Sequence, residues 1–456
     1  MTSGLGIDAL REHIGSGNVD TVLVAFPDLQ GRLMGKRVTG HYFLDHVEGE
    51  GIEACNYLLA VDVEMTPVPG YRFASWEQGY GDMKAVPDLA TLRPVPWLEK
   101  TALVLCDLVD GETGSPVEVS PRRILQRQVE RAAAAGYTVK CGSELEFFLF
   151  RDSYEEAEAK GYAGLEPHSP VIEDYHVLQT TRDEYLIRAI RNAMDASRVP
   201  VEFSKGEAGR GQHEINLEYA DALEMADRHV IYKNGTKEIA SLAGRAITFM
   251  AKYSMDEVGS SCHVHSSVWD ADGSSSLMWD DHAGDHFSGV FRGWLGGLLA
   301  TGRELAWLFA PTVNSYKRYQ PESWAPTALA WGRDNRTCGF RVVGRGQSFR
   351  VESRLPGADV NPYLAFAATI AGGLHGIEHD LDPGPRFDGN AYEAQDVTRV
   401  PETIVDAIAE LEASEVAGKA FGSEVHDHLV NTARQEWAGF NRVVTDWERR
   451  RNFEQF

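Results

Sequence analysis

The sequence contains few cysteines and no paired-cysteine motif. Five cysteines occur in 456 residues, an odd number, and they lie far apart at Cys55, Cys106, Cys141, Cys262 and Cys338. The absence of a CxxC pair or zinc-finger spacing argues against a disulfide framework and against a cysteine-based zinc site. We therefore expect reduced thiols in a cytoplasmic protein.

Basic charge and long apolar runs are also scarce. Lys and Arg number 44 against 68 Asp and Glu, for a formal net charge of −24, so neither nucleic acid nor an anionic membrane is expected as the main partner. The most apolar stretches are too short to span a bilayer or are interrupted by charges such as Arg292, Arg303 and Glu304. The N-terminal segment has no apolar signal core, so we expect no export and no membrane insertion.

Apolar residues are nevertheless plentiful enough for large cores, at 43% of the chain with 10% aromatic residues. Residues 20–38, "DTVLVAFPDLQGRLMGKRV", predict a β-hairpin, and strand and turn signals continue to Asp110. Ser120 and Pro121 then mark the start of a helix that ends at Gly136. We predict two domains, residues 1–112 and 113–456.

The second predicted domain alternates helices with strands. Helices are expected over residues 301–311, "TGRELAWLFAP", after the Asn361–Pro362 start signal, and in the amphipathic tail from Pro401 onward. The whole pattern predicts an α+β chain: a small β-rich domain followed by a large domain with a mostly antiparallel sheet.

Three predicted strands carry charged or ligating residues two positions apart. In "CGSELEFFLF", residues 141–150, Glu144 and Glu146 project from one face because strand residues alternate between faces. Two adjacent carboxylates repel each other unless a cation lies between them. The same spacing recurs at His263 and His265 and at Arg350, Glu352 and Arg354.

A fourth segment, "KGEAGRGQHEINLEY", adds Glu207 and Glu214 on either side of a Gly-rich turn. Five carboxylates and one imidazole would suit one or two hard cations such as Mg²⁺ or Mn²⁺ better than zinc. The alternative for each segment alone is a solvated sheet face. Four segments that all carry Glu or His favour a metal site.

Residues 314–354 are rich in arginine although the chain is acidic. Arginine forks bind carboxylates and phosphates, so this segment is expected to meet an anionic substrate and a polyphosphate; a solvated basic patch is the alternative. Metal-binding carboxylates beside such arginines are typical of phosphoryl transfer from ATP. The arginines are Arg318, Arg333, Arg336, Arg341, Arg345, Arg350 and Arg354.

Six segments resemble, in order and spacing, the signature segments of the glutamine synthetase family: "ELEFFLF", "GEAGRGQHEI", "GSSCHVHSS", "NSYKR", "DNR…FR" and "RVESRLPGADVNPYLAFA". The resemblance extends from the "DLQGRLMGKR" hairpin to the C-terminus. It implies a β-grasp N-terminal domain, a glutamine synthetase-type catalytic domain, and a homo-oligomer, expected as a dodecamer of two stacked rings with active sites between subunits.

The resemblance also assigns the ligands of two Mg²⁺ or Mn²⁺ ions in each active site. The matching residues are Glu146, Glu207 and Glu214 for one ion and Glu144, His263 and Glu352 for the other. Glutamate would be bound by Arg318, Arg354 and Gly259, and catalytic roles would fall to Arg318, Arg336 and Arg354. ATP contacts would come from His265, Ser267, Arg336, Arg341 and Arg350.

The mechanism implied by the resemblance has two steps. ATP phosphorylates the γ-carboxylate of L-glutamate to give γ-glutamyl phosphate, and an amine then displaces phosphate to leave an amide. Metal ions and arginines would neutralise the two anions as they approach each other. The attacking amine must lose a proton, because an ammonium ion has no lone pair.

The amine pocket departs from the family pattern. Ammonia-using members place a Glu on the flap after "NSYKR" and an Asp in the neighbouring N-terminal domain; here Trp324 stands at the Glu position, and the Asp position falls near Cys55 or Asn56. An indole can hold an alkylammonium by cation–π attraction worth about 0.5–2 kcal/mol. We therefore hypothesise a glutamate–amine ligase for a small primary amine, ethanolamine or a polyamine, with substrate-binding Trp324.

Other readings stay open at this point. Trp324 can be a packing residue with Glu322 as a substitute acid, in which case the chain would be an ammonia-using glutamine synthetase. A catalytically silent, ring-forming relative is a further alternative. Retention of all the matched ligands and phosphate-binding arginines argues against it. Val258 replaces the Asn that precedes the glutamate-binding Gly in ammonia-using members.

Overall fold

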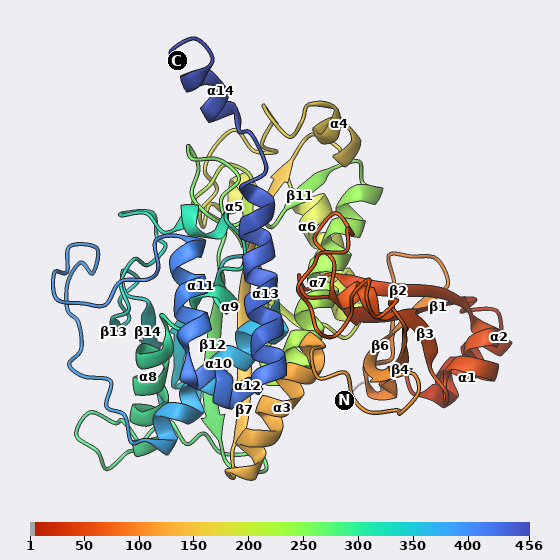
Figure 1. Ribbon diagram of the computed structural model, residues 1–456, viewed down its shortest axis with the longest axis horizontal. Coiled ribbons are helices and arrows are strands. Elements are labelled where there is room, and N and C mark those ends of the chain that lie inside the picture. Colours follow the sequence, from red (N-terminus) through yellow and green to blue (C-terminus); the bar gives the residue numbers. More distant parts are fainter. Residues whose placement is uncertain (1–4) are drawn as a thin grey trace.

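A computed structural model describes residues 5–456 of the protein. Its N-terminal part forms a six-stranded sheet with the order β2-β1-β6-β4-β3 and β5 beside β6, next to a larger helix-covered body (Figure 1). Only β1 and β6 run parallel among these described strands. The strands are β1 (Thr21–Pro27), β2 (Leu33–Thr39), β3 (Ile52–Cys55), β4 (Asp82–Pro87), β5 (Arg93–Pro94) and β6 (Thr101–Asp110).

The hairpin predicted over residues 20–38 is confirmed. β1 and β2 pair from Thr21 opposite Thr39 to Pro27 opposite Leu33. The Asp28 carboxylate closes the turn by accepting hydrogen bonds from the backbone N–H groups of Gln30 at 3.0 Å and Arg32 at 2.8 Å. Asp is favoured in such turns because its short side chain reaches backbone donors two or more residues ahead.

The larger part of the chain is built on a nine-stranded sheet with the order β13-β14-β15-β12-β7-β9-β8, with β10 and β11 also paired to β7. Only β13 and β14 are parallel among its described strands, so the predicted mostly antiparallel sheet is confirmed. The strands are β7 (Thr138–Phe150), β8 (Val201–Gly206), β9 (Gln212–Leu217), β10 (Ala220–Asp221), β11 (Ala246–Thr248), β12 (Cys262–Trp269), β13 (Trp331–Arg333), β14 (Phe340–Val343) and β15 (Arg350–Ser353).

Helices cover this sheet, as Figure 1 shows. α8 and α10 approach each other so closely that a Cβ on Gly376 would lie 2.0 Å from the carbonyl oxygen of Gly293; only glycine permits this packing. The helices are α1 (Ile7–Gly15), α2 (Gly40–Tyr42), α3 (Pro121–Ala134), α4 (Tyr154–Ala159), α5 (Val177–Thr180), α6 (Glu184–Ala196), α7 (Ala222–Leu242), α8 (Gly289–Thr301), α9 (Ala306–Phe309), α10 (Pro362–Glu378), α11 (Ile404–Ala413), α12 (Glu415–Phe421), α13 (Ser423–Phe440) and α14 (Asp446–Asn452).

Short 3₁₀ or π-helical segments occur at η1 (Phe43–Val47), η2 (Asn56–Leu59), η3 (Leu89–Thr91), η4 (Ser315–Arg318) and η5 (Gly346–Ser348). The predicted helix starts at Pro121 and Pro362 are confirmed, and the Asn361 side chain caps α10 by accepting from the N–H of Tyr363 at 3.1 Å. The continuous helix expected over residues 301–311 is wrong. α8 already ends at Thr301, and α9 is a single turn; Gly302, which follows α8, has a low helix propensity.

The two parts of the chain meet around Arg122, a fully buried residue of α3. Its guanidinium contacts Asp88 at 2.7 Å and Asp107 at 2.5 Å in the N-terminal part and Asp227 of α7 at 3.0 Å. The connection between β6 and α3 runs from residue 111 to residue 120. The domain boundary after residue 112 lies within this connection and stays a prediction.

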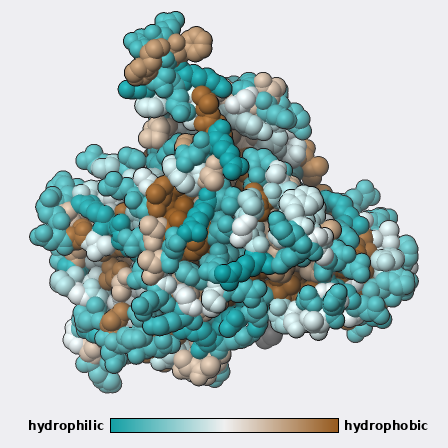
Figure 2. Space-filling view, viewed as in Figure 1, coloured by the Kyte–Doolittle hydropathy of each residue, from teal (hydrophilic) through white to brown (hydrophobic). Residues whose placement is uncertain are grey.

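The molecular surface in the view of Figure 1 is mainly hydrophilic, with separate hydrophobic patches (Figure 2). One patch lies next to α14 in the C-terminal segment, which projects away from the body of the molecule. Trp447 and Phe453, which are exposed, belong to this C-terminal segment. Within residues 5–456, no helix combines the length and apolar character needed to cross a membrane.

Candidate active site

The register of the large sheet brings together residues that lie far apart in the sequence. Glu144 of β7 lies opposite His263 of β12, and Glu146 of β7 lies opposite Glu214 of β9. In β15, Glu352 lies opposite His265 of β12. Because these residues share one face of the sheet, the alternation predicted from the sequence produces a single polar surface.

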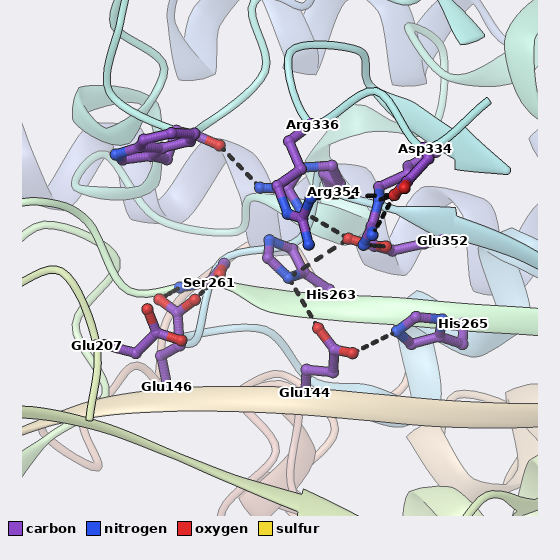
Figure 3. Close-up of polar contacts among 12 residues, drawn as sticks. Glu144, Glu146, Glu207, Ser261, His263, His265, Asp334, Arg336, Glu352 and Arg354 are labelled. Atoms are coloured by element: carbon purple, nitrogen blue, oxygen red, sulfur yellow. Dashed lines mark hydrogen bonds and ion pairs between the residues drawn. The ribbon is translucent and has the colours of Figure 1, made fainter. Parts of the chain in front are cut away.

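Glu144, His263 and Glu352 form the first predicted ligand group. Their ligand atoms lie within 4.8 Å of one another, with His263 Nδ1 3.1 Å from Glu144 and 3.7 Å from Glu352 (Figure 3). The other oxygen of Glu144 lies 2.8 Å from His265 Nε2. All are buried or half-buried, so the polar groups contact each other rather than bulk water.

Glu146, Glu207 and Glu214 form the second predicted ligand group, again with ligand atoms within 4.8 Å of one another. Ser261 orients Glu146 by donating its hydroxyl at 2.5 Å and its backbone N–H at 2.8 Å (Figure 3). Lys205 makes an ion pair with Glu207. The Gly-rich turn between β8 and β9 thus brings Glu207 back toward Glu214, as the sequence predicts.

The second group holds more negative charge than its surroundings neutralise. Burial raises the pKa of Glu146 to about 7, and the charge of Glu207 adds to the shift. Burial likewise raises the pKa of Glu214 well above its ordinary value, with further repulsion from Glu144 and Glu207. A divalent cation among these oxygens would relieve the repulsion, and oxygen-rich ligand sets suit Mg²⁺ or Mn²⁺.

The first group has the opposite electrostatics. Burial opposes ionisation of Glu352, but His263, His265 and Arg354 outweigh it and lower its pKa to about 2. Burial also opposes ionisation of Glu144, and His265 with His263 nevertheless hold its pKa far below the ordinary value. Both carboxylates are therefore ionised at neutral pH and available as ligands. The two groups together fit one or two hard divalent cations.

Two of the predicted arginines are buried beside these carboxylates. Arg354 contacts Glu352 at 2.6 Å and donates to the carbonyl oxygen of Trp324 at 3.2 Å. Arg318 donates to the carbonyl oxygens of Arg354 and Leu355, each at 2.9 Å. A Cβ on Gly259 would lie only 2.7 Å from the Arg318 side chain, so glycine is required there for close packing.

Two further arginines contact Asp334. Arg341 contacts Glu352 at 2.7 Å and Asp334 at 2.5 Å. Arg336 is exposed, and Figure 3 shows it above the same group. Its contact with Asp334 is long, at 3.9 Å, so Arg336 can reorient toward an incoming phosphate.

The predicted residues line two cavities of about 360 Å³ each, which share Glu144 and Asn216. We call the first the carboxylate cavity; it is lined by both ligand groups together with Gly259, Arg318, Trp324, Arg336, Arg341 and Arg354. We call the second the Trp269 cavity; it is lined by His265, Ser267, Trp269, Gln347 and Arg350 among others. The residues predicted for glutamate thus line the carboxylate cavity, and three of those predicted for ATP, His265, Ser267 and Arg350, line the adjoining Trp269 cavity.

Arg333 and Arg345, from the same arginine-rich segment, line neither cavity within the described residues. The Arg333 guanidinium instead lies 5.0 Å from the centre of the Phe349 ring. Trp324 lines the carboxylate cavity and is 58% exposed. Glu322 is not among the described residues that line this cavity. The flap therefore offers an indole to this cavity rather than a carboxylate.

Several lining residues were missed at the sequence level. Gln212 donates to Glu146 at 3.1 Å, Lys205 pairs with Glu207, and Asn216 lines both cavities. Gln212 and Asn216 lie two residues either side of Glu214, so the alternation in β9 could have identified them. Ser261 lies two residues before His263, so the same alternation could have identified it, although its contact with Glu146 depends on the pairing of β12 with β7.

Comparison with known proteins identifies the family. The sequence profile described as "Glutamine synthetase, catalytic domain" matches residues 118–452. The chain belongs to the glutamine synthetase family. Its N-terminal β-grasp-like sheet and antiparallel catalytic sheet match the fold of a solved GmaS/ADP complex, with a TM-score of 0.85 and 30% identity. The match covers 98% of this chain and 99% of that chain.

Two relatives of this family are similar over nearly their whole length. A γ-glutamylethanolamide synthetase, GlnA4 of Streptomyces coelicolor, is 51% identical over 454 residues, which cover 100% of this chain and 97% of that protein. A glutamate–isopropylamine ligase of a Pseudomonas species is 37% identical over 442 residues, or 96% of each chain. Both are named for amines larger than ammonia.

Proposed function

We propose that the protein is an ATP-dependent glutamate–amine ligase that joins the γ-carboxylate of L-glutamate to ethanolamine. The products are γ-glutamylethanolamide, ADP and phosphate. The single observation that carries the choice of an alkylamine is that Trp324 lines the carboxylate cavity. The family resemblance assigns this position to the flap glutamate of ammonia-using members. The likeness to a γ-glutamylethanolamide synthetase at 51% identity supports ethanolamine among such amines.

The buried arginines account for binding and activation of glutamate. Arg318 is fixed by two backbone carbonyls, and Arg354 is fixed by Glu352 and by the carbonyl oxygen of Trp324. Because these guanidinium groups are already fixed, they lose little conformational entropy when they bind a carboxylate or phosphoryl group. We assign them to glutamate and to the transferring phosphoryl group, with Gly259 beside Arg318.

The remaining basic groups suit the nucleotide. Arg350 donates to His265 Nδ1 at 3.0 Å and lines the Trp269 cavity with Ser267, so we assign these three residues to ATP. Arg336 and Arg341 face the carboxylate cavity and would meet the β- and γ-phosphates, with Arg336 also stabilising the transition state.

The carboxylates Glu146, Glu207 and Glu214 would hold one Mg²⁺ or Mn²⁺ ion, and Glu144, His263 and Glu352 a second. When bound, such ions neutralise phosphate charge and polarise the γ-phosphoryl oxygens. The chain itself prepares the ligands: Ser261 and Gln212 orient Glu146, and Arg341 with Arg354 orient Glu352.

We place the amine in the part of the carboxylate cavity that carries aromatic residues beside its carboxylates, and we call this part the acceptor pocket. Tyr175 and Phe203 line the carboxylate cavity together with Trp324. Aromatic faces attract an alkylammonium and pack against its carbon atoms, whereas ammonium offers no carbon to pack. The amine reacts only after losing a proton, and the cavity carboxylates are the available proton acceptors.

We further propose that the chain acts as a homo-oligomer, a dodecamer of two stacked rings with active sites completed between subunits. The exposed apolar residues Val443, Val444, Trp447 and Phe453 of the C-terminal segment support an interface there. A cytoplasmic location is proposed on the basis of the reduced cysteines and the acidic composition.

The direct test of this function is phosphate release with ATP, Mg²⁺ and glutamate across ammonium, methylamine, ethanolamine, putrescine and spermine. We expect the highest kcat/KM with ethanolamine and loss of activity when a chelator removes the divalent cation. Phosphate release fastest with ammonium would contradict the assignment of the amine. Absence of release with every amine would instead favour the silent scaffold.

A further inference from the structure

A group of imidazoles and carboxylates lies on the opposite face of the large sheet from the carboxylate cavity. His213 precedes Glu214 in β9, so its side chain points away from that cavity. Its Nε2 lies 2.8 Å from Asp183 and 3.6 Å from Glu173, and Asp183 also contacts His168 Nδ1. We call His168, Glu173, Asp183 and His213 the His213 cluster.

Glu173 is the unexplained member of this cluster. It is completely buried, and neither of its carboxylate oxygens has a hydrogen-bond partner within residues 5–456. The nearby Ser169 hydroxyl donates instead to the carbonyl oxygen of Val171 at 3.1 Å. A buried carboxylate without a partner is strongly unfavourable, so a cation beside Glu173 would offset the cost of its burial.

Asp183 gives independent evidence from its place in the helix. It occupies the N-cap position of α6, where an Asp side chain usually accepts a hydrogen bond from the first turn. The Asp183 side chain makes no such bond. Its two oxygens face His168 and His213 instead, so Asp183 bridges the two imidazoles, and Glu173 approaches one of them, His213.

We propose that the His213 cluster binds one Zn²⁺ ion, or a transition-metal ion of similar preference, at a structural site. The ligand atoms of Glu173, Asp183 and His213 lie within 4.8 Å of one another. His168 lies at the edge of this group, in contact with Asp183, and would supply the fourth ligand when the ion binds. Two imidazoles and two carboxylates suit four-coordinate zinc, and two carboxylates balance its charge. The carboxylate cavity, rich in oxygen ligands, prefers Mg²⁺ or Mn²⁺.

The position of the cluster gives the ion a structural role. His168, Glu173 and Asp183 belong to the segment between β7 and α6, whereas His213 belongs to β9. An ion bound by all four would fasten this segment to the sheet. Tyr175, two residues after Glu173, lines the carboxylate cavity, so the ion would stabilise one wall of the acceptor pocket.

Metal analysis of the full-length enzyme tests the proposal. After purification without chelator and dialysis against excess Mg²⁺, we expect about one zinc ion per chain. Glu173→Gln and His168→Gln should lose this ion, while the control Glu207→Gln, altered in the carboxylate cavity, should retain it. The proposal would be overturned if Glu173→Gln and His168→Gln retained the ion while Glu207→Gln lost it. It would also be overturned if the wild-type enzyme bound no stoichiometric zinc even after incubation with zinc.

Measurements on the wild-type chain remain decisive if the variants fail to fold. X-ray absorption of the zinc-loaded enzyme in excess Mg²⁺ should show two imidazole nitrogens and carboxylate oxygens around the ion; a shell without a pair of imidazoles would overturn the site. Removal of zinc should also lower Tm, and zinc but not Mg²⁺ should restore it. A Tm unchanged by zinc removal would contradict the structural role.

Discussion

At the scale of single residues, the carboxylate cavity depends on partners that fix each acidic side chain. Glu146 is held by Ser261 and Gln212, and Glu352 by Arg341 and Arg354. These contacts limit the positions available to the carboxylates and so organise them before a cation binds. Trp324 differs from them because its side chain remains largely exposed to the cavity and is free to meet the amine.

The first prediction concerns Trp324. Trp324→Glu should lower the preference for ethanolamine over ammonium, measured as the ratio of the two kcat/KM values, by about tenfold, because it removes a cation–π face worth ~0.5–2 kcal/mol and adds an anion that attracts ammonium. Steady-state phosphate release measures the ratio.

Two controls separate this effect from general damage to the flap. Trp324→Phe keeps an aromatic face and should retain the preference for ethanolamine. Glu322→Gln should leave it unchanged, because Glu322 is outside the lining of the carboxylate cavity in the described chain. An unchanged ratio in Trp324→Glu would place amine selection at other residues.

At the scale of secondary-structure elements, strand alternation explains how much of the active site could be predicted. Residues two positions apart in β7, β12 and β15 share a face whatever the rest of the fold, so the pairs at 144/146, 263/265 and 350/352 follow from local geometry. The order of the strands in the sheet does not follow from local geometry, because it depends on long-range pairing. Ser261 acquires its role only when β12 lies beside β7.

The errors at this scale have the same origin. The apolar composition of residues 301–311 suited a helix, but α8 ends at Thr301, before Gly302, a residue of low helix propensity. The His213 cluster was not predicted because its residues are dispersed between 168 and 213 without regular spacing. Only the return of the segment before α6 toward β9 brings them together.

Helix α13 provides a prediction about pH. His428 is buried against Tyr71, with ring centres 4.4 Å apart, and burial lowers the pKa of His428 to about 4. The unfolded chain binds a proton at His428 below pH ~6.5, whereas the folded chain does not until pH ~4. Stability should therefore fall as the pH decreases through this window, by about 3 kcal/mol from this residue.

His428→Gln should remove that part of the pH dependence. Urea unfolding of both proteins at several pH values between pH ~6.5 and ~4 gives the slope of the unfolding free energy against pH for each protein. Contributions from other titrating groups cancel in the difference between the two slopes. Parallel stability curves for the two proteins would show that His428 does not carry the effect.

At the scale of the whole molecule, the N-terminal and catalytic parts are joined by a buried charge network. Arg122 contacts three carboxylates from both parts, and Tyr363 of α10 donates to Asp227 at 2.6 Å. This junction fixes the N-terminal sheet relative to the large sheet. In the proposed oligomer, that sheet would carry the residues that complete a neighbour's active site.

Removing Arg122 should destabilise the protein strongly. Arg122→Leu leaves Asp88, Asp107 and Asp227 without their shared cation, which should cost about 3–5 kcal/mol of unfolding free energy. The adjacent Arg123 is a matched control. It pairs with Glu118 and Glu130 at the surface, so Arg123→Leu should cost less than about 1 kcal/mol. Similar losses for both variants in urea unfolding would contradict this account of the junction.

The most direct test of the proposed function is a competition between two amines in one reaction. The enzyme receives ATP, Mg²⁺, glutamate and equal concentrations of ethanolamine and ammonium, and mass spectrometry quantifies the two amides. The product ratio equals the ratio of the two kcat/KM values. We predict that γ-glutamylethanolamide exceeds glutamine by at least about tenfold; glutamine as the main product would contradict the account.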